Sequence, residues 1–157
     1  MNRLARAMLA ILLAAGGTAA HAQDASVRQR LESRGMKYEI DKDGDFRVVL
    51  SIRGTKRTQQ VFVSGGVQTI GSVAIRKVFS PAAVLSRNPV DGARALELLR
   101  DAATDKIGSW EIQGGVLYLV AKLPDSASAA ELATVMDMLT ALADDMEQKT
   151  SGTADAL

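Results

Sequence analysis

The alternation of apolar and polar residues predicts four β-strands in the first half of the chain. Apolar side chains recur at every second position in residues 36–40 and 46–53, and β-branched residues are frequent in residues 58–64 and 68–80. A period of two is typical of strands with one buried face. Turn residues separate the strands, and Pro81 is expected to end the last one. The pattern favours an antiparallel meander.

Helical spacing predicts a short helix before these strands and a long helix near the end of the chain. Residues 24–34 place two apolar side chains four positions apart, and Gly35 follows where a helix terminator belongs. In residues 128–149, Ser128 and Glu131 have the spacing of a capping box, and apolar residues then recur every three or four positions. We expect the long helix to cover one face of the sheet.

A third helix and a hairpin complete the pattern. Asn88 is the expected N-cap of a helix that ends near residue 106. Its expected apolar stripe consists of Leu96, Leu99 and Ala103. Gly114-Gly115 then separates strands at residues 109–112 and 116–123. The resulting order, α-β-β-β-β-α-β-β-α, predicts an α+β fold in which helices pack on an antiparallel sheet.

The N-terminus has the three zones of a cleavable secretory signal peptide. Arg3 and Arg6 precede an apolar run at residues 7–15, and small residues follow as far as Ala20-His21-Ala22. The run is shorter than the about 20 residues that span a bilayer. We therefore expect cleavage after Ala22, at a signal formed by Ala20 and Ala22, and a periplasmic product. An N-terminal membrane anchor or a buried helix is the alternative.

The expected cleavage divides the chain into three parts. Residues 1–22 are the signal peptide, residues 23–149 a single α+β domain, and residues 150–157 a small, polar tail that we expect to be disordered. No cysteine follows the apolar run, so no residue could carry a lipid anchor. We expect no stable attachment to a membrane.

Charge and composition narrow the function. The chain has 19 basic and 18 acidic side chains, and the signal peptide holds two of the basic ones, which leaves a mature formal charge of −1. Such a balance gives no electrostatic basis for binding nucleic acid. Cysteine is absent, and the single histidine, His21, lies in the signal peptide. The mature chain therefore lacks the residues of Ser-His-Asp and Cys-His catalysis and of ordinary zinc or copper sites.

Three glycine- or aspartate-rich segments could be taken for ligand sites. Residues 41–45, Asp-Lys-Asp-Gly-Asp, place carboxylates at alternate positions, but the glycine and the twelfth residue do not match a helix-loop-helix calcium loop, so a hairpin turn is the better interpretation. Gly65-Gly66 and Gly114-Gly115 separate strands and do not lead into helices, so they are expected to be turns. We expect no cofactor and no resident metal.

Three segments resemble the YbjN family. They are residues 73–81 (VAIRKVFSP), residues 108–111 (GSWE) and residues 143–147 (ADDME), and the resemblance extends over about residues 31–147, including the Asp-Gly-Asp turn. It implies a fold similar to that of the type III secretion chaperones, a curved antiparallel sheet with helices packed on it, in an architecture that dimerises and binds peptides. The expected signal peptide distinguishes this chain from cytoplasmic members of the family.

The leading functional hypothesis is a non-catalytic periplasmic binding module. It would receive an extended segment of a protein partner, or of a second copy of itself, at a sheet edge or in a groove between helix and sheet. Phe79, Trp110 and Met138 are the candidate partner-binding residues. Two alternatives remain open: a carboxylate-dependent enzyme acting on envelope polysaccharide, and a small-ligand carrier with an apolar pocket.

Overall fold

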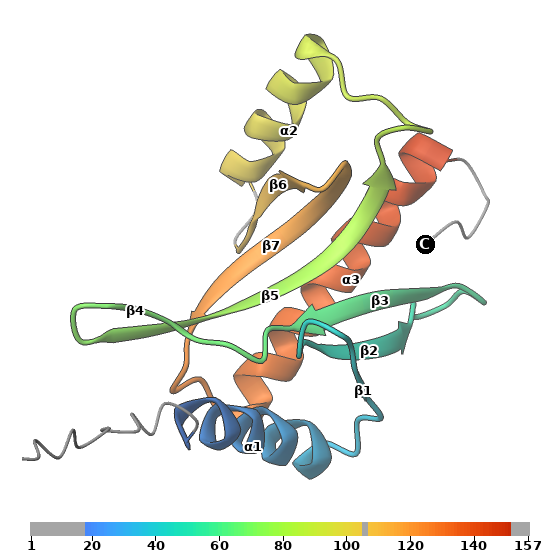
Figure 1. Ribbon diagram of the computed structural model, residues 1–157. Coiled ribbons are helices and arrows are strands. Elements are labelled where there is room, and N and C mark those ends of the chain that lie inside the picture. The colour runs from blue at the N-terminus through green and yellow to red at the C-terminus, as the bar shows by residue number, and fades with distance from the viewer. Residues whose placement is uncertain (1–17, 105–106, 152–157) are drawn as a thin grey trace, which may run out of the picture.

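The computed structural model describes residues 18–104 and 107–151, with side chains described from Ala25 to Thr150 (Figure 1). The elements in this part of the chain are α1 (Thr18–Ser33), β1 (Glu39–Ile40), β2 (Phe46–Ser51), β3 (Thr58–Val63), β4 (Gln68–Ile70), β5 (Val73–Val84), α2 (Gly92–Thr104), β6 (Ser109–Gln113), β7 (Val116–Pro124) and α3 (Ala129–Ser151). Residues 1–17 of the expected signal peptide lie outside the described residues, whereas residues 18–22 belong to α1.

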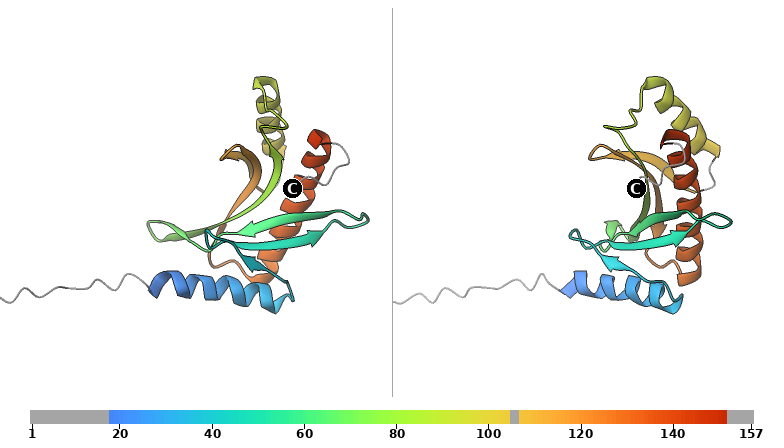
Figure 2. Two further views of the ribbon diagram at one scale, coloured as in Figure 1. Left: turned by 45° about the vertical axis from the view of Figure 1, so that its right-hand side comes forward. Right: turned by 90° about the vertical axis from the view of Figure 1, so that its right-hand side faces the viewer.

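The strands form one sheet in the order β1-β2-β3-β5-β7-β6, and β4 pairs with β5 beside this path. Every pairing is antiparallel. The predicted α+β fold, with helices packed on an antiparallel sheet, is confirmed. The long strands β5 and β7 curve along their length (Figure 2).

The segment expected to be one strand at residues 68–80 is a hairpin of the short β4 and the long β5, so five strands precede α2 and not four. Gly71 turns the chain between β4 and β5 with φ of 59°, a value that glycine adopts readily. Pro81 does not end β5, which continues to Val84 with a register shift between Pro81 and Ala83. Proline is tolerated at such an irregularity because a ladder hydrogen bond is already missing there.

The helix ends confirm two of the predicted terminal signals and correct a third. Gly35, with φ of 66°, follows α1 as predicted, and Ser128 and Glu131 form the expected capping box, in which the Ser128 amide donates to Glu131 Oε2 at 2.7 Å. Asn88 does not cap α2: the helix begins at Gly92, and Asp91 Oδ1 accepts a 2.8 Å hydrogen bond from the Arg94 amide. At the other end, α3 continues to Ser151, so the first two residues of the expected tail are helical, and residues 152–157 lie outside the described part.

The helices lie on one face of the sheet, which we call the helix face. Alternate strand residues point toward α1 and α3 there and form the main core with residues of both helices (Figure 2). The strand residues of this core are Phe46, Val48, Val61, Val63, Val78, Leu119 and Ala121, and the helix residues are Val27, Leu31, Leu132, Val135, Met136 and Leu139. A second, smaller core holds α2 through Leu98, which packs with Leu117 and Met146.

The opposite side of the sheet, which we call the open face, carries the intervening residues of the same strands. Figure 2 shows that none of the three described helices crosses it. Its residues on β3, β5 and β7 include Phe62, Lys77, Phe79 and Tyr118, all of them half-buried. Helices therefore cover only one face of the sheet, and the open face combines these half-buried side chains with the buried Pro81 and Val120.

Two arginines fasten parts of the fold to one another: Arg76, which is buried, and Arg57, which is half-buried. Arg76, 1% exposed, donates from Nε to Asp125 Oδ1 at 2.7 Å and from Nη1 to the carbonyl oxygens of Ser64 and Gly65. Arg30 of α1 donates to the same carboxylate and to the carbonyl of Asp125. Asp125 thus joins α1, β5 and the loop between β7 and α3. Burial by itself would raise the pKa of Asp125, but the hydrogen bond and charge of Arg76, assisted by Arg30, outweigh that effect and lower it.

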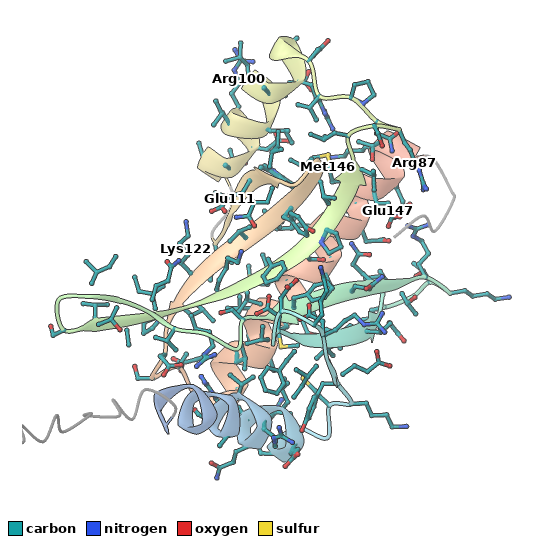
Figure 3. The ribbon with its side chains drawn as sticks, in the orientation of Figure 1. Arg87, Arg100, Glu111, Lys122, Met146 and Glu147 are labelled. Carbon is teal, nitrogen blue, oxygen red and sulfur yellow. The ribbon has the colours of Figure 1, made fainter. Side chains whose placement is uncertain are left out.

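The other arginine fastens the β2–β3 hairpin to α3. Arg57 donates from Nε to Asp144 Oδ1 at 2.6 Å and from Nη2 to Glu147 Oε2 at 3.2 Å. Both carboxylates are at most 1% exposed. Glu147 is labelled in Figure 3, near the end of α3. Buried carboxylates need such a partner because an unpaired charge is costly away from water.

None of the described helices combines the length and the apolar character that crossing a bilayer would require.

Replacing Asp125 with asparagine is expected to destabilise the fold by about 2 to 4 kcal/mol, because the buried Arg76 would lose its anionic partner. The lowered pKa of Asp125 adds a pH signature. Its stabilising effect is present above the unfolded-state pKa of aspartate and is lost as the pH falls through the folded-state value. Urea unfolding at pH 7 and pH 3 measures both effects.

The matched control is Asp43→Asn, because the Asp43 side chain is 69% exposed. The control should unfold like the parent at both pH values. If Asp125→Asn were as stable as the parent at pH 7, the assigned role of the Arg76–Asp125 pair would be wrong.

Candidate protein-binding surfaces

An exposed apolar surface beside a sheet edge is formed by α2 and β6. Leu96 and Leu99 of α2 are 53% and 68% exposed, and Ile112 of β6 is 54% exposed. Between the two elements lies a hollow of about 270 Å³, whose lining includes Leu98, Leu99, Trp110, Ile112 and Leu117. We call this region the α2–β6 surface. Apolar side chains grouped in this way on a soluble protein are typical of an interaction site.

The strand in this surface is also an edge of the sheet. Within the described residues, β6 pairs with β7 on one side only. Its outer backbone N–H and C=O groups are therefore available to a further strand. Hydrogen-bonding groups and apolar side chains thus occur together on the same five-residue segment.

The apolar stripe predicted for α2 is wrong. Leu96, Leu99 and Ala103 are expected to be buried, whereas the structure exposes all three and buries Leu98. The physical reason is that α2 starts three residues later than expected and packs against β6 and the last turns of α3. Leucines at 96, 98 and 99 cannot all share one helical face, and this spacing was the available signal that some of them point outward.

Trp110 has a different role from the one expected. It is half-buried between the two core clusters, packs against both, and lines the hollow of the α2–β6 surface. Its Nε1 is buried and has no hydrogen-bond partner. Gly108, with φ of 94°, brings the preceding chain close to β7, where a Cβ atom would lie 3.1 Å from the carbonyl oxygen of Val120. Trp110 therefore connects the surface to the core.

A second apolar surface lies between α3 and the end of β7, and we call it the α3–β7 groove. It is a hollow of about 560 Å³. Its lining consists of Ile107, Leu123, Pro124, Ala127, Ala130, Glu131, Thr134, Val135 and Met138. Met138, predicted as a partner-binding residue, is half-buried in this groove. An unbranched thioether suits a surface that must adapt to varied side chains.

The third candidate residue, Phe79, lies on the open face. Its ring stacks on Phe62 with centroids 5.1 Å apart and meets Tyr118 edge-on at 5.6 Å. The structure therefore distributes Phe79, Trp110 and Met138 over three separate surfaces and brings none of them together. The α2–β6 surface was missed as a site because its apolar residues were assigned to the core.

Several acidic side chains already accept hydrogen bonds from backbone amides within the fold. Glu131 lines the α3–β7 groove and accepts the Ser128 amide and hydroxyl, hydrogen bonds that lower its pKa. Asp41 accepts the amides of Asp43 and Asp45 at 2.9 Å within the β1–β2 turn. Burial raises the pKa of Asp45, against the opposing effect of a hydrogen bond from the Gly65 amide. Among the described residues, no three acidic or histidine side chains are grouped so that they could hold a metal ion.

No protein-family model matches this chain, and no curated protein does. Solved structures that are similar to it in fold include the following two. One is the Yersinia pestis type III secretion chaperone SycH, solved with a stable fragment of YscM2, at 15% identity and a TM-score of 0.51 over 79% of this chain and 98% of the other. The second comes from the HopA1–SchA chaperone–effector complex, at 10% identity and a TM-score of 0.54 over 81% and 97%. The chain therefore shares the fold of type III secretion chaperones.

The different positions of the α2 leucines can be tested by truncation. Leu98→Ala is expected to lower the free energy of unfolding by about 2 to 4 kcal/mol, because Leu98 is buried in the smaller core. Leu99→Ala, at an exposed position, should cost less than about 0.5 kcal/mol in dilute solution. Urea unfolding followed by circular dichroism measures both values, and equal losses would contradict the observed orientation of α2.

Proposed function

We propose that this chain is an exported, non-catalytic protein-binding module with a chaperone-like fold. The observation that carries the proposal is the α2–β6 surface, where a strand edge that is unpaired within the described residues lies beside a hollow lined by the exposed side chains of Leu99 and Ile112. The comparisons support it at the level of fold, since both similar structures come from chaperone complexes. The resemblance to the YbjN family belongs to the same proposal.

A strand added to β6 would use both the free backbone edge and the exposed apolar side chains of this surface. Its backbone would pair with the free edge of β6, and its side chains, or a helix next to it, would cover Leu96, Leu99 and Ile112. Main-chain pairing of this kind provides affinity, and side-chain pockets provide specificity. The hollow beside Trp110 would accept one apolar side chain of the added segment.

We propose a second copy of the chain as the occupant of the α2–β6 surface. Two copies related by a two-fold axis can pair β6 with β6 in the antiparallel direction that the rest of the sheet uses. Each α2 would then cover the exposed leucines of the other. The α3–β7 groove stays free in such a dimer and is the proposed site for an apolar segment of a client protein.

Export is the remaining part of the proposal. The N-terminal pattern of arginines, an apolar run and Ala20-His21-Ala22 supports a periplasmic location after cleavage. A partner or client would then be a protein of the cell envelope. Cytoplasmic secretion effectors would not meet this protein.

Binding of a small apolar ligand is the second candidate function, and the α3–β7 groove favours it. Its volume of about 560 Å³ falls in the usual range of roughly 300 to 1,000 Å³ for ligand sites, and its lining is mostly apolar. The variant Met138→Glu distinguishes the two functions. If the groove binds a client protein, the variant should lose binding of an envelope protein. If the groove carries a small ligand, the purified variant should no longer contain an extractable lipid or other apolar molecule.

Replacing Ile112 with glutamate is expected to convert the protein from a dimer to a monomer. The change places a charge where two β6 strands would meet, and the same charge from the other copy would repel it. Sedimentation velocity at about 100 μM chain measures the mass. Ile70→Glu is the control, since Ile70 is equally apolar and 68% exposed but lies on the β4–β5 hairpin.

The control should remain dimeric. A parent protein that sediments as a monomer at this concentration would refute the proposed self-association, and so would a dimer that both variants retain.

Cleavage of the signal peptide is expected to leave Gln23 as the first residue of the exported protein. Intact-mass measurement of protein recovered from the periplasmic fraction tests this directly. Ala20→Arg should prevent cleavage, because signal peptidase needs a small side chain at that position, whereas Ala19→Arg should be cleaved like the parent. Recovery of the uncleaved chain in the cytoplasmic fraction would contradict the export proposal.

A further inference from the structure

Methionine supplies every sulfur atom of this chain, because cysteine is absent. The sequence contains six methionines, and Met1 and Met8 belong to the expected signal peptide, which leaves four in the exported protein. Mild oxidants convert the methionine thioether to a sulfoxide, which makes an apolar side chain polar. The effect of oxidation on this protein therefore depends on where these four side chains lie.

Two of the four thioethers are enclosed in the cores. Met136 is 0% exposed and belongs to the main core, and Met146, labelled in Figure 3, is 2% exposed and belongs to the smaller one. The sulfur of Met146 also accepts a hydrogen bond from Arg94 Nη2 at 2.9 Å. An oxidant in solution therefore reaches neither sulfur unless the fold opens locally.

The other two methionines are half-buried and differ in their surroundings. Met36 packs against the main core. Met138 lines the α3–β7 groove and, among the described residues, belongs to neither core. The groove is a hollow of about 560 Å³, so hydrogen peroxide, which is only slightly larger than water, has room to enter it. Oxidation of Met138 would therefore change a surface and leave the packing of both cores intact.

The groove has no side chain that could satisfy a sulfoxide oxygen. Glu131 and Thr134 are the only polar residues of its lining. A carboxylate such as Glu131 is an acceptor, and the Thr134 hydroxyl already donates to the carbonyl of Ala130 at 2.9 Å. An oxygen on Met138 would therefore stay hydrated. An apolar group could enter the groove only by removing that water, which costs free energy.

We propose that hydrogen peroxide oxidises Met138 to the sulfoxide and that this modification weakens the binding of an apolar client segment or ligand in the α3–β7 groove. The inference rests on the proposed binding role of the groove and adds its regulation. The proposed location outside the cytoplasm provides the oxidising conditions. The groove would then bind under reducing conditions and release under oxidising ones.

The reaction needs no group other than the thioether and the peroxide. A lone pair of the sulfur attacks one peroxide oxygen, the S–O bond forms and the O–O bond breaks. The released hydroxide takes the proton of the transferred oxygen and leaves as water, so the sulfur is oxidised and the peroxide is reduced. A methionine sulfoxide reductase reverses the change with a dithiol, which becomes a disulfide while the oxygen leaves as water.

The test uses purified protein with carbon-13 at the methionine methyl groups, so that NMR reports each thioether separately. The probe is N-phenyl-1-naphthylamine, a neutral apolar dye. The dye is expected to shift the methyl signal of Met138. Peroxide should convert Met36 and Met138 at least about tenfold faster than Met136 and Met146, because the latter two are buried. Dye affinity should then fall by about tenfold or more, and reductase with dithiothreitol should restore it.

Met138→Leu is the decisive variant, and Met36→Leu is its matched control, because Met36 is the other half-buried methionine. Each variant is compared with itself before and after peroxide. The dye affinity of Met138→Leu should be the same in both states, whereas Met36→Leu should lose affinity on oxidation as the parent does. The circular dichroism of Met36→Leu should not change with peroxide, since neither core gains a polar side chain.

The outcomes separate this proposal from the binding function beneath it. A dye that leaves the Met138 methyl signal unmoved would refute the groove as an apolar site, and its regulation with it. Dye that binds at Met138 with the same affinity after oxidation would overturn the regulation alone. Loss of affinity in oxidised Met138→Leu would also overturn it, because another residue would then be responsible.

Discussion

Side chains along β5 alternate between the two faces of the sheet, and this alternation determines which residues enter the core and which lie on the open face. This strand pairs with β3, β4 and β7, and its successive residues face opposite sides of the sheet. Val78 and Ser80 are buried beneath α3, whereas Lys77 and Phe79 lie on the open face. A register slip of one residue would exchange the two faces and place a lysine in the core. Every proposed surface depends on this division.

The two ends of the sheet differ in how far their polar and apolar groups are satisfied within the chain, and partner binding is proposed at the end where they are not. At the end of the sheet beside α1, Asp125 accepts hydrogen bonds from Arg30 of α1 and from the buried Arg76 of β5. These charged hydrogen bonds hold α1, β5 and the loop after β7 together. At the other end, α2 rests on a small core through Leu98 and leaves Leu96 and Leu99 in solvent. The last strand there, β6, has a free edge. The fold is thus closed by internal pairing at one end, whereas the other end presents groups that a second chain can complete.

Local signals in the sequence predicted local structure well. Gly35 and the Ser128–Glu131 capping box were recognised because a terminator and a cap act within one helical turn. The period of two predicted β2, β3 and β7 within one or two residues, since each has one buried face. Residues 68–84 were harder, because the turn at Gly71 and the irregularity after Pro81 depend on which strands lie beside them.

The binding surfaces could not be predicted in the same way. Exposure of Leu99 and burial of Leu98 follow from where α2 packs, which is a tertiary contact and not a sequence period. Phe79, Trp110 and Met138 were chosen by residue type, and type does not specify the face on which a residue lies. Fold likewise does not specify function, which has to be argued from the surfaces themselves.

Hydrogen exchange of the β6 amides tests the central claim most directly. In an edge strand that takes up a second chain, the outer amides of residues 109–113 become hydrogen-bonded only when that chain is present. We expect their protection to rise at least about tenfold between 1 μM and 200 μM protein, while the protection of the β3 amides stays constant. Protection of β6 that is independent of concentration would contradict it.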